Sequence, residues 1–98
     1  MNFIDFLQEN KKRHLAEAAE LAAADRRDDA VFAKIRANVF DIFLQVGDKS
    51  HKIFEHLKIK WANEKALAEE HGDTAAAAIE QIKLEMLYEI EKELKANG

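Results

Sequence analysis

Residues 30–47 read AVFAKIRANVFDIFLQVG, and this stretch decides the fold class of the chain. Its apolar residues recur at alternating intervals of three and four, which is the period of an α-helix and not the two-residue alternation of a strand. Gly47-Asp48 then ends the segment, since glycine is the usual residue just beyond a helix C-terminus. We therefore predict a helix whose core-facing side consists of Phe32, Ile35, Val39, Ile42 and Val46.

The same helix carries apolar residues on its reverse side, where Arg36 is the main interruption. A helix that is apolar over more than half its circumference must be covered on more than one side. It is either the central helix of a bundle, in contact with every other helix, or it presents an exposed surface to another protein or a second copy of the chain. The reverse side consists of Ala33, Ala37, Phe40 and Leu44.

Three further segments have the helical period. The first spans about residues 2–24, with Asn2 as its N-cap. Another runs from about 49 to 71 and is stopped by Gly72, and the last restarts at Asp73 or Thr74 and runs to about 96. Their apolar sides are Phe3, Ile4, Leu7, Leu15, Ala18, Leu21 and Ala22 in the first, Ile53, Phe54, Leu57, Trp61, Leu67 and Ala68 in the third, and Ile79, Ile82, Met86, Leu87, Ile90 and Leu94 in the fourth.

The break between the first two helices is the least marked, because Asp25-Arg26-Arg27-Asp28-Asp29 contains no glycine. An internal similarity favours a real turn there: a shift of 46 or 47 residues aligns the apolar positions of the first half with those of the second, where Gly72 breaks the chain. Residues 1–98 are therefore expected to form one all-α domain, a four-helix up-down bundle built from two αα-hairpins and more than about 70% helical.

Composition narrows the function classes. The formal net charge of −4 disfavours nucleic acid and anionic membrane surfaces as partners, and the absence of cysteine is compatible with a cytoplasmic protein. The apolar stretch at the N-terminus, interrupted by Asp5 and Glu9, is too short for a signal sequence or a membrane span.

Catalytic patterns are missing from the sequence. Apart from tyrosine, the only hydroxyl side chains are Ser50 and Thr74, which stand where helices start, and there is no glycine-rich phosphate loop. The four histidines include no Glu-x-x-His pair of the kind that di-iron bundles use. We therefore expect no enzyme activity, no cofactor and no metal site.

Three polar residues fall on or beside apolar sides of the helices. Lys11 and Glu64 either pair with each other, if the first and third helices run side by side, or extend their charged ends to water. With His14 they define an alternative function, in which Lys11, His14 and Glu64 line a cavity for a small ligand or a metal.

The favoured function is a non-enzymatic interaction module that binds another protein or forms a homodimer. Its surface is expected on the reverse side of the second helix, at Ala33, Ala37, Phe40 and Leu44, or on the fourth helix, where Leu84 and Tyr88 lie one turn apart.

Overall fold

The computed structural model describes residues 2–97, and these form four α-helices joined by short connections. The helices are α1 (Phe3–Ala23), α2 (Arg27–Val46), α3 (Ser50–Glu70) and α4 (Thr74–Asn97), and the 3₁₀ turn η1 (Gly47–Lys49) links α2 to α3. Helix accounts for 93% of the structure and none of the described residues is in a strand, so the predicted all-α class is confirmed.

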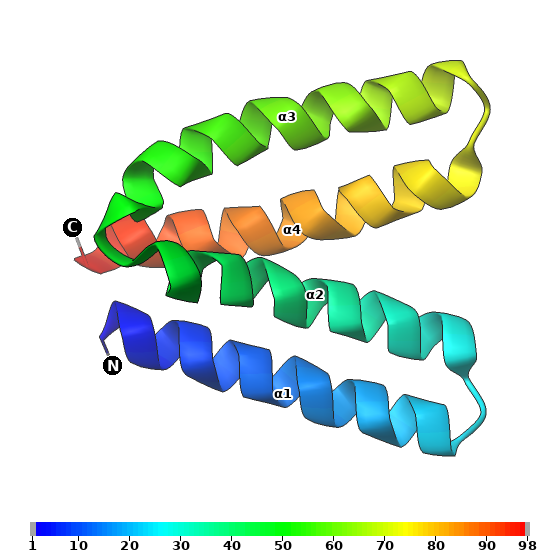
Figure 1. Ribbon diagram of the computed structural model, residues 1–98, viewed down its shortest axis with the longest axis horizontal. Coiled ribbons are helices and arrows are strands. Elements are labelled where there is room, and N and C mark those ends of the chain that lie inside the picture. The colour runs from blue at the N-terminus through cyan, green and yellow to red at the C-terminus, as the bar shows by residue number, and fades with distance from the viewer. Residues whose placement is uncertain (1, 98) are drawn as a thin grey trace.

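The helices form two hairpins, α1 with α2 and α3 with α4, as predicted (Figure 1). Across the molecule their order is α1, α2, α4, α3, with α2 and α4 running in the same direction at the centre. Among the described residues no Cα atom of α1 lies within 8 Å of one of α3. The bundle is therefore a flattened array of 37 × 34 × 19 Å in which α1 and α3 are the outer helices.

The turn of the first hairpin is real, as the internal similarity predicted, but it lies at residues 24–26 and not at 26–29, because Arg27, Asp28 and Asp29 already belong to α2. The N–H of Arg26 donates to the carbonyl of Leu21 at 2.9 Å, and the N–H of Asp25 donates to that of Ala22 at 3.1 Å. Asp25 itself has a left-handed φ of 62°. This is a Schellman motif, which satisfies the last carbonyls of the helix while reversing the chain.

The turn of the second hairpin repeats this pattern. The N–H of Asp73 donates to the carbonyl of Ala68 at 2.8 Å, and the N–H of Gly72, with φ 70°, donates to that of Glu69 at 3.1 Å. Asp73 is also the N-cap of α4, because its Oδ1 accepts the N–H of Ala76 at 3.0 Å.

The other helix starts agree only partly with the sequence. Asn2 caps α1 as predicted, since its Oδ1 accepts the N–H of Asp5 at 2.8 Å. Ser50 does not cap α3 in this way; its hydroxyl donates to the carbonyl of Gly47 at 2.6 Å and so fastens the 3₁₀ turn.

The hydrophobic core lies where α2 and α4 meet and where the outer helices cover them. Of the side of α2 that was expected to face the core, only Val39 is fully buried, while Phe32, Ile35, Ile42 and Val46 are half-buried. On α1, Ile4 and Leu15 are 44% and 45% exposed, so that side was also misplaced in part. The buried core consists of Leu7, Val39, Phe40, Phe43, Phe54, Leu57, Trp61, Leu84, Met86, Leu87 and Ile90.

Candidate functional site

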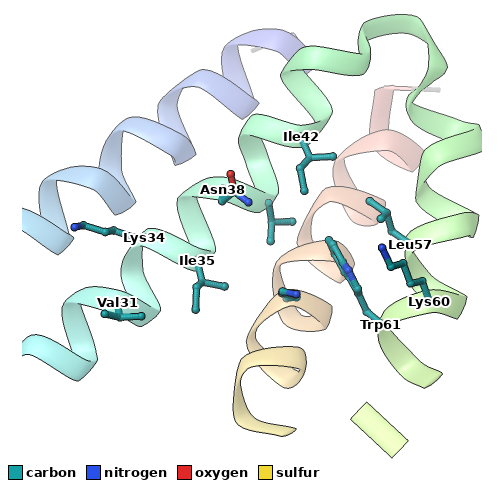
Figure 2. A pocket seen from close by; sticks show the side chains of 10 residues that line it. Val31, Lys34, Ile35, Asn38, Ile42, Leu57, Lys60 and Trp61 are labelled. Carbon is teal, nitrogen blue, oxygen red and sulfur yellow. The ribbon is translucent and has the colours of Figure 1, made fainter. Parts of the chain in front are cut away.

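An open groove lies between α2 and α3, above α4, where the two hairpins diverge (Figure 2). Its volume is about 560 Å³. Ten residues line it, and we call it the α2–α3 groove: Val31, Lys34, Ile35, Asn38, Val39, Ile42, Leu57, Lys60, Trp61 and Lys83.

The groove has an apolar floor and a solvent-exposed wall. Val39, Leu57 and Trp61 are at most 9% exposed and belong to the core, so the floor is continuous with it. The wall on α2 is different, because Val31 is 51% exposed and Ile35 only half-buried. The groove is thus the place where the apolar interior reaches the surface.

The wall on α2 follows one side of that helix over three turns. Val31, Ile35, Asn38 and Ile42 are spaced by three or four residues, so they form a single row. At 1.5 Å per residue the row is about 16 Å long. The sequence predicted that two members of this row, Ile35 and Ile42, would face the core; in the structure the row is the side of α2 that no other helix fully covers.

Three lysines are the charged residues of the groove, one from each helix that forms it. Lys34 on α2 and Lys60 on α3 are exposed; in Figure 2 Lys60 lies beside Trp61, whereas the side chain of Lys34 extends from the outer rim of α2, away from α3. Lys83 on α4 is half-buried at the floor. None of the ten lining residues is acidic. The groove is therefore basic in a chain whose net charge is −4.

Lys83 is held in place by two contacts. Its Nζ lies 5.4 Å from the centre of the Trp61 ring and 3.0 Å from Oε1 of Glu80. Glu80 is 9% exposed, and its Oε2 has no hydrogen-bond partner within the described structure. The cation–π contact and the ion pair fix Lys83 and orient the indole of Trp61.

The reverse side of α2 is not the exposed surface that the sequence suggested. Ala33, Ala37 and Phe40 are 0–2% exposed within a single chain. Phe40 packs on His14 and Phe6 of α1, with ring centres 5.7 and 6.0 Å apart. The alternative interpretation, in which α2 is the central helix, is confirmed: the small alanines let α1 approach closely and cover this side.

The other three residues of the expected interface are not brought together either. Leu84 is 6% exposed and part of the core, so it cannot anchor another chain beside Tyr88, which is 46% exposed. Leu44 is half-buried and packs against the core near the exposed Leu15. The predicted patch on α4 is thus reduced to one exposed tyrosine.

The three polar residues expected to face inward do not share a cavity. Lys11 pairs with Asp41 of α2, Nζ to Oδ1 2.8 Å, and not with Glu64, because α1 and α3 are not neighbours. The lysine beside Asp41 lowers the pKa of that carboxyl. His14 lies between α1 and α2, far from Glu64, so the predicted cavity of these residues is wrong.

His14 is nonetheless unusual. Only 7% exposed, it has no hydrogen-bond partner on either ring nitrogen within the described structure. Burial, and then the charge of Arg13, lower its pKa below the ordinary value of 6.5. Glu17 stands 3.9 Å from Nδ1 but is bound to Arg36 at 2.7 Å, and this hydrogen bond lowers the pKa of Glu17.

The remaining histidines do not form a metal centre. His51, His56 and His71 are exposed, and the part of the chain that the structure describes contains no group of three or more side chains arranged to hold a metal ion. Nor is any helix in that part long and apolar enough to cross a membrane.

The groove has only a weak signal in the sequence. Lys34, Lys60 and Lys83 are far apart in the chain, and the sequence places Trp61 only on the apolar side of the third helix. The available signal is the width of the apolar surface of α2, but the sequence pattern predicts the exposed part of that surface on the reverse side, which the structure buries.

Comparison of the chain with protein-family models, with curated proteins and with solved structures gives no match. The function must therefore be argued from the groove itself.

Proposed function

We propose that the chain is a non-enzymatic interaction module that binds an amphipathic helix of another protein in the α2–α3 groove. The observation that carries this proposal is the uncovered row on α2, where apolar side chains continuous with the core are open to solvent. Exposed apolar surface of this kind usually marks an interaction site.

A helix suits the shape of this groove. The row on α2 spans about three turns, and a partner helix inserts apolar side chains at positions i, i+4 and i+7 over the same length. A helix laid between α2 and α3 would cover Val31 and Ile35 while packing on Trp61.

A catalytic role has less support. Ser50 is 3% exposed and its hydroxyl is engaged with Gly47, so it is not placed as a nucleophile. The expected cytoplasmic location and the homodimer stay predictions. The homodimer has less support than before, because α1 covers the side of α2 that was expected to form its interface, at Ala33, Ala37 and Phe40.

The proposal can be tested by selecting peptides from a displayed library of amphipathic helices against the immobilised chain. Selected peptides should carry apolar residues at i, i+4 and i+7. They should also perturb the indole resonance of Trp61, the chain's single tryptophan, and the amide resonances of the row on α2.

Val31→Glu tests the site directly, because Val31 is 51% exposed and its substitution leaves the core intact. Binding should be lost in this variant and kept in Ile59→Glu, which changes a 62% exposed residue that does not line the groove. If selection yields no saturable binder, or if binders tolerate Val31→Glu, the proposed function is wrong. Saturable binding of oleate in the groove without any peptide binding would favour the small-ligand alternative instead.

A further inference from the structure

The charged residues that line the α2–α3 groove indicate what charge its partner helix carries, in addition to the apolar side chains that the groove accepts. Acidic residues outnumber basic ones in this chain, 19 to 15, yet the groove is lined by three lysines and no carboxylate. Its positive character therefore comes from the arrangement of the helices and not from the overall composition.

The two lysines on the walls are available for a partner. Neither Lys34 nor Lys60 forms an ion pair with any described residue, and both are exposed. Their aliphatic stems can lie along the apolar walls while the ammonium groups stay at the rim. Lys83, in contrast, is already paired with Glu80 at the floor.

A second copy of the chain does not fit this groove in a symmetric dimer. A twofold axis through the groove would place the same surface opposite itself, so Lys34 and Lys60 of one copy would face those of the other. Like charges brought together in this way oppose association.

We propose that the partner helix is acidic, with an apolar stripe that enters the groove and carboxylates along both edges of the stripe that reach Lys34 and Lys60. This inference rests on the proposed function and adds the chemistry of the partner to it. Because Lys34 comes from α2 and Lys60 from α3, the two helices that flank the groove, an acidic residue on only one edge of the partner helix can pair with only one of the two lysines.

Three synthetic helical peptides with the same apolar stripe test the charge requirement, with Glu, Gln or Lys at the edge positions. We expect the Glu peptide to bind at least about tenfold more tightly than the Lys peptide, with the Gln peptide between them. Raising the salt concentration from about 0.05 to 0.5 M should weaken the Glu peptide several-fold and leave the Gln peptide nearly unchanged. Titrations followed by Trp61 fluorescence give these dissociation constants.

Charge-reversal variants show whether the preference for the Glu peptide comes from the two groove lysines. Lys34→Glu and Lys60→Glu should each weaken the Glu peptide and strengthen the Lys peptide, whereas Lys12→Glu, an exposed position on α1 outside the groove, should change neither. Circular dichroism confirms that each variant is folded.

The outcomes separate this inference from the proposed function. If all three peptides bind equally and Val31→Glu still abolishes binding, the groove binds helices but the acidic partner is wrong. If the Glu peptide binds and Lys12→Glu weakens it as much as Lys34→Glu, the attraction is a general charge effect and the inference is also wrong. If no peptide binds, both proposals fail.

Discussion

Asp25 and Gly72 occupy the same position in two Schellman motifs that are 47 residues apart. Both have a left-handed backbone, with φ 62° at Asp25 and 70° at Gly72, and both donate their N–H to the carbonyl three residues earlier. Only glycine adopts this conformation without a steric cost from Cβ. The first hairpin therefore contains local strain that the second avoids.

Replacing Asp25 with Gly should stabilise the protein. Relief of the left-handed strain contributes about 1 kcal/mol, reduced by the greater freedom of glycine in the unfolded chain. The ion pair that Asp25 forms with Arg27 is highly exposed and contributes little. Urea denaturation should show a higher midpoint with an unchanged slope.

The reciprocal change is the control. Gly72→Ala should lower the midpoint by a comparable amount, although a Cβ there meets no atom within 4 Å, because the cost lies in the backbone and not in a clash. Equal stability of wild type and both variants would show that the turns are not strained.

Substitutions of Phe40 test whether this residue belongs to the core, as in the structure, or to an exposed interface, as the sequence suggested. It is 0% exposed and packs against two rings of α1, so Phe40→Ala should cost about 3–5 kcal/mol of folding free energy. Phe40→Glu should unfold the chain. Tyr88→Ala, at a position 46% exposed, should change stability by less than about 0.5 kcal/mol. If the Phe40→Glu protein folds, Phe40 is exposed at the surface and the core assigned here is wrong.

The Lys11–Asp41 pair can be measured by a double-mutant cycle. With side chains 38% and 26% exposed, the pair is screened by solvent, and we expect a coupling free energy of about 0.5 kcal/mol. The corresponding cycle for Lys11 and Glu64 should give zero, because their helices are not in contact. Coupling in the second cycle and none in the first would require α1 and α3 to be neighbours.

His14 should make stability depend on pH. Its pKa is lowered in the folded chain, so below about pH 6.5 the unfolded state binds a proton that the folded state does not. Stability should be constant above this pH as far as His14 is concerned, and should fall as the pH drops from 6.5 toward the folded-state pKa. The groups facing His14 are Arg13, Glu17, Arg36 and Glu89.

Urea midpoints at pH 7.5 and 5.5 measure this dependence in wild type and His14→Leu. The variant should lose most of the change in this interval, whereas His56→Leu, at an exposed site, should keep it. Glu17 and Asp41 act in a lower range. Their pKa values are lowered by hydrogen bonds from Arg36 and Lys11, so their contributions to stability are lost as the pH falls below 4.5 for Glu17 and below 3.8 for Asp41. If His14→Leu kept the loss between pH 7.5 and 5.5, another group would be responsible.

The number of helices, nearly all of their ends and their pairing into hairpins follow from the amino-acid sequence alone. These features depend on local chemistry: apolar period, the cap at Asn2, and a turn whose repeat at Gly72 made the unmarked turn at Asp25 predictable. Local rules suffice because the groups involved lie within about six residues of each other.

Which side of α2 contacts which helix depends instead on how the four helices pack together. Phe40 and Ile35 are equally apolar in the sequence, but Phe40 is enclosed by α1 and Ile35 is left in the groove. Ala33 and Ala37 contribute little to an apolar pattern, yet their small size lets α1 approach that side, and the larger stripe was therefore assigned to the core in error. The groove takes its lysines from three helices for the same reason: helical periodicity fixes the direction of each side chain around its own helix axis, and the packing of whole helices fixes what that direction faces.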